Sequence, residues 1–429
     1  MKKLKWIFIP IVIALIISNT YLFMNIHTED TTDDYVTLTI WGYDNYILDA
    51  FSEYQIKHPN LKLNFIKVDE SEYFNKLKQA IALNEPLPDI CILDSGSIAG
   101  IDGGELFVDL EKEPYAINRK NVIEYSLAQY ENNHGHLWAV PATLSASGVV
   151  YNRNIASHML GSDDPYQVSV VFSSWADVIS KGHSYCANNP EHYIFANLQD
   201  PAIIMFGQSK EAYIQNNKLL EPYRFANYFK ILYSLKTHEL TANYQLGSPG
   251  WYDSLKRDEI FFYPCSLNMI SRGVFDSGTS FGFTRSPSGS YSWGGTVWAI
   301  PQKSRYIDEA WDFLKTMLLS SSGAMYAKNY GNGTFISYLP AYELEGYKSL
   351  PVKEFNNQDV GEIYFDYIYP QIEELPYSQY QSVIYDVYLE VVLAMMMDDT
   401  LDADESYALF IQRVKEELPQ VDLSEVSDE

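Results

Sequence analysis

Aromatic and short polar side chains follow two predicted strands of this chain, at the places where the strands end. They are Trp41, Tyr43 and Asp44 after the first strand, and Asp94 and Ser95 after the third. An aromatic ring offers a flat, amphipathic face, and a carboxylate accepts strong hydrogen bonds from hydroxyl groups. This combination of residue types favours a ligand-binding site.

Motifs for catalysis or metal binding are weaker. His134 and His136 are spaced by two and lack the acidic and third-ligand pattern of a zinc site, so no metal and no cofactor is expected. The sequence SASG at 145–148 has no preceding glycine of a nucleophile elbow, and a P-loop motif is absent. A carboxylate pair for glycoside hydrolysis stays open, because the chain has 56 acidic residues and no spacing singles out a pair.

The elements that position these residues alternate between strand and helix. Strands are predicted over 36–40, 61–65 and 89–93, with helices over 47–57 and 71–84 between them. This order predicts a parallel α/β sheet. Ligands of such sheets bind outside the carboxyl ends of the strands, where the aromatic and polar residues lie.

The stretch 293–319 has two halves with different periods. Residues 294–300 are apolar and end at Pro301, as a buried strand would. Apolar residues then recur at helical spacing: Ile307, Ala310, Trp311, Leu314, Met317 and Leu318. A helix without a capping box is predicted there, because Ile307 stands three residues after Ser304. Trp298 and Trp311 are assigned to the core.

The remaining elements are predicted from shorter patterns. Helices are expected over 119–131, 175–181, 202–214, 221–237, 377–397 and 404–418, and strands over 149–152 and 260–263. The last residues, 421–429, form an acidic tail. Trp251 follows Ser-Pro-Gly in a predicted loop, which favours an exposed indole ring.

The N-terminus carries a targeting pattern. Lys2, Lys3 and Lys5 precede a mostly apolar run over 6–26. This run has about the length that a bilayer crossing needs, and Ser18-Asn19-Thr20 is a poor cleavage site. We therefore expect residues 1–26 to be a signal anchor or signal peptide, and 27–35 a linker, with the bulk of the chain outside the membrane.

The composition of the chain restricts the classes of partner that it can bind. The net charge of −26 argues against nucleic acid and against anionic membrane surfaces. Hydrophobic residues make up 47% of the chain and charged residues 20%, which are globular values. Cys91, Cys186 and Cys265 are widely spaced and are interpreted as buried small residues.

Five blocks together resemble a known family, the extracellular solute-binding proteins of ABC transporters that capture sugars and oligosaccharides. The blocks are the strand at 36–41 with the helix ending His58-Pro59-Asn60, Leu87-Pro88-Asp89-Ile90, the run 137–152, the run 281–304 with its Gly294-Gly295 pair, and Ala310–Leu314. One departure is that no cysteine lies near the apolar N-terminal run, where Gram-positive members usually carry a lipid.

The resemblance implies an α/β fold of the two-lobed, periplasmic-binding-protein-like (maltose-binding-protein-like) type, with a hinge and an interlobe cleft. Residues 36–142 plus 297–342 would form the first lobe, and 143–296 plus 343–420 the second. The chain would cross between the lobes near 142, 296 and 342. The Gly294-Gly295 pair would then give one crossing its backbone freedom.

The resemblance also implies which residues bind a carbohydrate, whose CH faces need aromatic platforms and whose hydroxyls need short polar side chains. The expected platforms are Trp41, Tyr43, Trp251 and Trp293, and the expected hydrogen-bonding residues are Asp44, Asp94, Ser95, Thr143 and Ser145. Gly294 is expected to lie against the ligand.

The resulting functional expectation is a receptor, not an enzyme, that closes on a carbohydrate and delivers it to the permease subunits of an ABC transporter. A sugar-sensing subunit for a histidine kinase and an extracellular glycan-degrading enzyme stay open as alternatives. The expected location is the extracellular face of the cytoplasmic membrane, anchored N-terminally, or the medium if the signal is cleaved. We expect a monomer with no other membrane contact.

Overall fold

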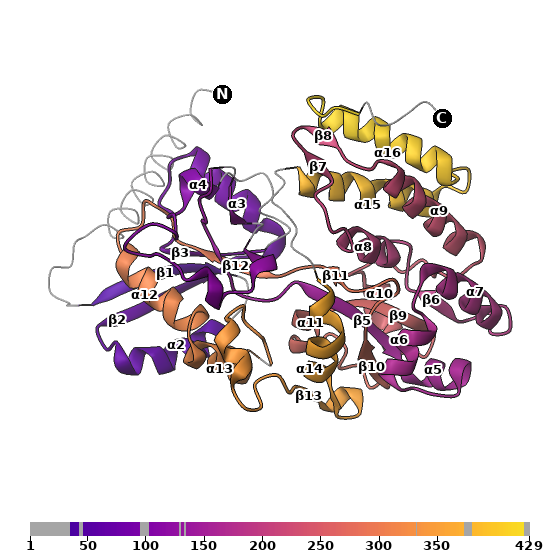
Figure 1. Cartoon of the computed structure of the whole chain (residues 1–429), viewed down its shortest axis with the longest axis horizontal. Coiled ribbons are helices and arrows are strands. Elements are labelled where there is room, and N and C mark those ends of the chain that lie inside the picture. Colours follow the sequence, from indigo (N-terminus) through magenta and orange to yellow (C-terminus); the bar gives the residue numbers. More distant parts are fainter. Residues whose placement is uncertain are drawn as a thin grey trace, which may run out of the picture.

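The computed structural model describes residues 35–42, 46–94, 103–127, 130–132, 134–331, 333–372 and 380–423. The predicted signal segment, 1–26, lies outside the described residues. Among the residues that are described, no helix has both the length and the apolarity required to cross a membrane. The molecule has two lobes, each built around its own sheet (Figure 1).

The first lobe contains a five-stranded mixed sheet. Its strands run in the order β2 (Leu61–Lys67), β1 (Val36–Gly42), β3 (Ile90–Asp94), β12 (Thr296–Ala299) and β4 (Val140–Pro141). β1 is parallel to both β2 and β3, which confirms the parallel sheet predicted from the alternating elements. β12 is antiparallel to β3 and to β4, because the chain returns to this sheet from the other lobe.

The helices of this lobe are α2 (Tyr46–Lys57), α3 (Glu70–Ala82), α4 (Gly103–Leu106), α12 (Ile307–Leu318) and α13 (Ser321–Tyr330). The sequence predicts three of them, α2, α3 and α12, and does not predict α4 and α13. α12 begins without a side-chain cap, as expected, and buries Phe313 against Trp298 at a ring distance of 6.0 Å. Trp298 is a core residue, whereas Trp311 is only partly buried and packs at the edge of the core against Tyr115.

The helix predicted over 119–131 is wrong. Two short 3-10 turns stand there, η1 (Arg119–Asn121) and η2 (Glu124–Ser126). The backbone between them bonds to a distant segment instead of to itself, because Ile123 N donates to Ser337 O at 3.0 Å and Val122 bridges to Tyr338. The turn η4 (Leu339–Glu343) follows that segment. Tertiary pairing therefore overrides the helical pattern.

The second lobe contains a four-stranded sheet with a short additional strand. The order is β10 (Phe281–Thr284), β5 (Ala146–Asn152), β9 (Ile260–Ser266) and β6 (Tyr193–Phe195), and β11 (Tyr291–Ser292) also pairs with β5. Its helices are α5 (Arg153–Leu160), α6 (Pro165–Val171), α7 (Trp175–Cys186), α8 (Gln199–Gly207), α9 (Tyr223–Thr237), α10 (Pro249–Ser254), α11 (Leu267–Ser271), α15 (Gln381–Met397) and α16 (Ala403–Glu417).

The helix predicted over 202–214 ends earlier, at Gly207. A side chain at that position would lie 2.4 Å from the carbonyl oxygen of Ser292, so β11 approaches the helix closely there. The chain then forms the hairpin of β7 (Ile214–Gln215) and β8 (Lys218–Leu219). The first residues of the acidic tail pack on this hairpin, since Leu219 N donates to Asp422 O at 3.1 Å and Val421 is buried.

A long return segment leads from the first lobe to the second. It contains β13 (Pro351–Val352), the turn η5 (Lys353–Phe355), β14 (Gln358–Asp359), α14 (Val360–Ile363), the π-helical η6 (Tyr364–Ile368) and the turn η7 (Tyr369–Gln371). β13 and β14 form a small antiparallel pair.

The apolar core is continuous between the lobes. One cluster of buried side chains contains Leu38 and Trp298 around the first sheet, and Tyr263 and Phe281 on one face of the second. Ile368 of the return segment belongs to the same cluster. The opposite face of the second sheet packs in a separate cluster with α8, α9, α15 and α16. The domain boundaries expected from the sequence stay a prediction.

Candidate functional site

Two connections between the sheets lie side by side at the junction of the lobes. Residues 142–145 join β4 to β5, and residues 293–295 join β11 to β12. Ala142 N donates to Thr296 O at 2.7 Å, and Trp293 N donates to Ser145 O at 2.8 Å. The hydroxyl of Ser292 also donates to Ser145 Oγ at 2.9 Å. The predicted residues of both connections are therefore brought together.

Thr143 joins the two lobes through its hydroxyl group. Thr143 Oγ1 accepts a hydrogen bond from Thr296 N at 2.9 Å and one from Asn268 Nδ2 at 3.3 Å. Asn268 lies on α11 of the second lobe. Because Thr143 is 7% exposed, its hydroxyl serves the packing of the junction in this conformation.

Trp293 is partly buried and forms a pair with a residue that the sequence analysis missed, Tyr385 on α15. The side chain of Trp293 lies near enough to the hydroxyl group of Tyr385 to act on it as a hydrogen-bond partner, which by itself lowers the pKa of the phenol. The ring of Trp293 stacks on Tyr291 at 6.4 Å and 25°, and the ring of Tyr385 packs edge-on against Phe206 at 5.0 Å. These contacts fix one aromatic and one hydroxyl group at the end of β11.

Asp94 contributes a carboxylate from the other lobe. It is the last residue of β3, lies opposite Thr296 in the strand register, and is partly buried. Burial raises the pKa of Tyr385 well above its ordinary value, and the carboxylates of Asp386 and Asp94 raise it further. Asp94 is thus near enough to the Trp293–Tyr385 pair for its charge to act on the phenol.

Gly294 has a backbone conformation that favours glycine. Its φ is +73° and that of Gly295 is +106°, and a side chain built at Gly294 would meet nothing within 4 Å. The conformation, not the available space, therefore requires glycine at position 294. This agrees with the expected backbone freedom of the crossing.

Two of the predicted platforms are covered in the structure. The expectation that Trp251 is exposed in a loop is wrong, because Ser248 caps the short helix α10 and directs Trp251 against Tyr263, leaving it 1% exposed. Trp41 is 8% exposed, with Lys76 Nζ 4.5 Å from its ring centre and Tyr73 edge-on at 6.5 Å. Tyr43, Asp44 and Ser95 lie outside the described residues.

Nothing in the sequence distinguishes Tyr385 from the rest of the 35 tyrosines in the chain. Its helix was predicted, but the side of α15 that meets β11 depends on the packing of Phe206 and α8 between them. Ser292 has no distinguishing pattern either, because it stands in a Gly/Ser-rich stretch that is typical of a loop. Ser292 belongs to the site through the register of β11 with β5, and Tyr385 through its packing against Phe206 of α8.

The described residues offer neither a metal-binding cluster nor an exposed thiol at this site. Within the described residues, no group of three His, Cys, Asp or Glu side chains could hold a metal ion. Cys91, Cys186 and Cys265 are free and buried, which confirms their interpretation as small core residues. A pocket of about 380 Å³ between α2, α12 and α13 is lined by none of the predicted site residues.

Solved structures with the same fold bind solutes. A crystal structure of extracellular solute-binding protein family 1 is 20% identical, covers 89% of this chain and 100% of its own, and has a TM-score of 0.80. The GacH receptor of Streptomyces glaucescens GLA.O, solved unliganded and with acarbose, is 14% identical, with coverage of 90% and 99% and a TM-score of 0.71.

A third structure is the ABC transporter associated binding protein from B. animalis subsp. lactis Bl-04 in complex with beta-1,6-galactobiose. It is 13% identical, covers 90% of this chain and 98% of its own, and has a TM-score of 0.70. At these identities the likeness shows the two-lobed fold alone.

The sequence itself also matches a protein family. No curated protein matches the chain. Residues 49–349, well over half of the chain, match the model for bacterial extracellular solute-binding proteins. The chain therefore belongs to the family of bacterial extracellular solute-binding proteins, as the five sequence blocks predict.

Proposed function

We propose that this protein captures a carbohydrate between its two lobes and delivers it to an ABC permease. The observation that carries the proposal is the placement of Asp94, from the first lobe, near the Trp293–Tyr385 pair of the second. A sugar offers apolar CH faces and hydroxyl groups. An indole ring, a phenol and a carboxylate are the groups that bind those two features.

Two serines extend the polar surface of this site. Ser145 and Ser292 are partly buried and lie on adjacent segments, with their hydroxyl oxygens 2.9 Å apart. Each hydroxyl group can donate one hydrogen bond and accept two, so the pair has capacity left for a solute. Both serines lie next to Trp293. Ser145 O accepts a hydrogen bond from Trp293 N, and Ser292 directly precedes Trp293 in the chain.

Binding would proceed by closure of the lobes. A ligand shifts the equilibrium between open and closed states only as far as it binds one of them better. A solute held by Asp94 on one side and by Trp293 on the other contacts both lobes only when they are closed. The connections at 142–145 and 293–295, the latter with two glycines at positive φ, would absorb the rotation.

The relatives support a carbohydrate as the solute. Two of the proteins that share this fold were solved with acarbose and with beta-1,6-galactobiose. A binding role also agrees with the family, which is named for solute binding and not for catalysis. We propose that the receptor acts at the extracellular face of the membrane as a monomer, held there by its N-terminal segment.

A panel of mono- and oligosaccharides, added to the full-length protein in a thermal unfolding assay, tests the proposal. A bound sugar at 100 times its Kd stabilises the folded protein by about 2.7 kcal/mol, which raises the melting temperature measurably. In Trp293→Ala and in Asp94→Ala the shift should shrink. If no sugar shifts the unfolding of the parent, or both variants respond like the parent, the proposed site is refuted.

A sensing subunit for a histidine kinase is the second candidate. The observation that favours it is the lack of a cysteine beside the apolar N-terminal run, so that the chain would be held by an anchor and not by a lipid. Isolating the protein from membranes together with its partners distinguishes the two candidate functions. Recovery of permease subunits supports delivery, whereas recovery of a kinase supports sensing.

A further inference from the structure

One part of the return segment touches both lobes. Residues 344–359, which we call the strap, leave the first lobe after η4 and end at β14 beside the second sheet. On the first lobe, Lys328 Nζ of α13 donates to Tyr347 O at 2.7 Å. The buried ring of Tyr347 packs edge-on against Phe335 at 5.5 Å. The beginning of the strap is thus fastened to the first lobe.

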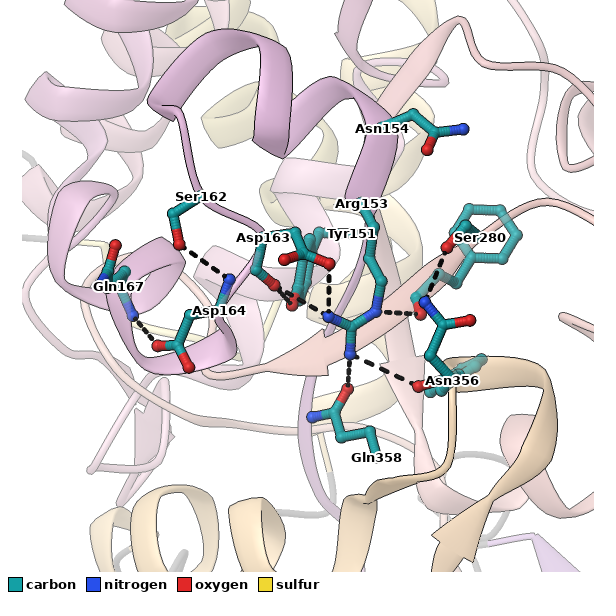
Figure 2. Close-up of polar contacts among 12 residues, drawn as sticks. Tyr151, Arg153, Asn154, Ser162, Asp163, Asp164, Gln167, Ser280, Asn356 and Gln358 are labelled. Carbon is teal, nitrogen blue, oxygen red and sulfur yellow. Dashed lines mark hydrogen bonds and ion pairs between the residues drawn. The ribbon is translucent and has the colours of Figure 1, made fainter.

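The far end of the strap is fastened to the second lobe by Arg153. This guanidinium group is 8% exposed and lies between three chain segments (Figure 2). Nε donates to Phe281 O of β10 at 2.8 Å, and Nη1 donates to the backbone oxygen and the carboxylate of Asp163 at 2.9 and 3.1 Å. Nη2 points to the strap, donating to Gln358 Oε1 at 2.9 Å and to Phe355 O at 3.5 Å.

Gln358 completes the connection from the side of the strap. Its Oε1 also accepts a hydrogen bond from Phe283 N at 3.0 Å, and its Nε2 donates to Phe283 O at 2.7 Å. The amide therefore pairs with β10 as a neighbouring strand would. Asn356 Nδ2 adds a bond to Ser280 Oγ at 3.2 Å (Figure 2).

Only an arginine supplies these contacts from one side chain. A guanidinium group has five N–H donors in a rigid fork, and Arg153 has five acceptors within hydrogen-bonding distance. Three of those acceptors belong to the second lobe and two to the strap. A buried cation needs its partners, so movement of the strap away from Arg153 would leave the Nη2 donors without their two acceptors on the strap.

We propose that Arg153 and Gln358 form a latch that holds the strap on the second lobe and so sets the resting angle between the lobes. The other two connections, at 142–145 and 293–295, are short and lie at the candidate site. The strap is longer and is anchored at both ends, so it limits how far the lobes separate. The consequence for solute affinity rests on the proposed function, whereas the resting angle does not.

Distances between spin labels on the two lobes of the full-length protein, measured without any solute, test the latch. Ile56 on α2 is 74% exposed and Tyr223 on α9 is 60% exposed, so Ile56→Cys and Tyr223→Cys provide label sites on opposite lobes. The native thiols do not compete, because burial raises the pKa of Cys91, Cys186 and Cys265 and keeps them protonated.

The decisive variant is Gln358→Met, which keeps the length of the side chain and removes its three hydrogen bonds. Arg153→Met is the second variant, and Asp163→Asn is the matched control, because it alters an Arg153 contact within the second lobe and leaves the strap contacts in place. Circular dichroism and unreactive native thiols verify that each variant is folded.

We expect Gln358→Met to broaden the interlobe distance distribution and move it to longer distances, with Asp163→Asn resembling the parent. An unchanged distribution in Gln358→Met would overturn the latch, and so would an equal change in Asp163→Asn. If Arg153→Met fails to fold, Gln358→Met alone still tests the latch. If the distances respond in this way but the protein binds no sugar, the proposed function is refuted and the latch is supported.

Discussion

The bond between Trp293 and Tyr385 gives the candidate site its most specific feature at the scale of single residues. Trp293 also stacks on Tyr291 and Tyr385 packs against Phe206, so both rings are held by neighbours before a solute arrives. An aromatic platform that is ordered before binding loses no further conformational entropy when the solute binds. Loss of that bond should therefore weaken binding without removing either ring.

Tyr385→Phe tests this prediction. A hydrogen bond of this kind contributes about 0.5–1.5 kcal/mol net, which corresponds to a decrease in solute affinity of about 2- to 12-fold. Calorimetric titration with the sugar found in the unfolding assay measures it. Tyr407→Phe, on a partly buried tyrosine of α16, is the control and should bind as the parent does. Equal affinities of Tyr385→Phe and the parent would contradict the preorganised pair.

At the scale of elements, the glycine at position 294 gives a left-handed backbone conformation to a connection between the two sheets. Gly294→Ala should destabilise the protein by about 1–2 kcal/mol, because φ is +73° and no steric clash adds to that cost. Gly278→Ala is matched, since Gly278 has a φ of +85° and equally open surroundings in a loop of the second lobe.

Urea unfolding of both glycine variants should give similar losses in the free energy of unfolding. Only Gly294→Ala should also change solute affinity, because position 294 lies in a crossing between the lobes and position 278 does not. If both variants bind equally well, the crossing at 293–295 does not take part in closure.

The strap carries a pH-dependent contribution to stability. Burial alone would raise the pKa of Asp359, but hydrogen bonds from Ser349 Oγ and from the backbone N–H groups of Leu350 and Glu362 outweigh it and lower the pKa. The two shortest of these bonds are 2.6 and 2.7 Å. Because the folded pKa lies below the unfolded value of about 3.9, the stabilisation is complete above that pH and is lost as the pH falls through the folded pKa.

Asp359→Asn should therefore lower the free energy of unfolding at pH 7, while the difference from the parent narrows below about pH 4. Urea titrations at several pH values measure this. Asp366→Asn, on η6 of the same return segment, is the control. A difference between Asp359→Asn and the parent that is the same at every pH would mean that the carboxylate charge does not contribute.

The sequence predicts where helices and strands lie better than it predicts which of their faces meet other elements. The strands β1, β2 and β3 and the helices α2 and α3 follow from periodicity, because each is short, regular and bounded by turn residues. The segment 119–131 has a helical pattern, yet Ser337 and Tyr338, more than two hundred residues away, take up its backbone bonds. No local pattern contains that pairing.

The candidate site shows the same limit. Asp94 and Trp293 stand at strand ends, which the order of elements identifies in advance. Trp251 also follows a loop signal, but Ser248 turns that loop into a helix and buries the indole ring. Tyr385 reaches the site through the packing of α15 on α8, and such helix-to-helix contacts leave no mark in the spacing of a single sequence.

At the scale of the whole molecule, the two lobes share one apolar core. Leu38 of the first sheet and Phe281 of the second belong to the same cluster of buried side chains, which Ile368 of the return segment also joins. Two lobes that move as separate bodies are often separate in unfolding as well. Here, exposing the core of either lobe would also strip apolar contacts from the other.

Thermal unfolding should consequently be a single cooperative event. Differential scanning calorimetry is expected to give one peak, with a calorimetric enthalpy close to the van't Hoff enthalpy, in place of two peaks for two lobes. The continuous core thus makes the molecule thermodynamically single: its two lobes have separate sheets, yet they are folded and unfolded together.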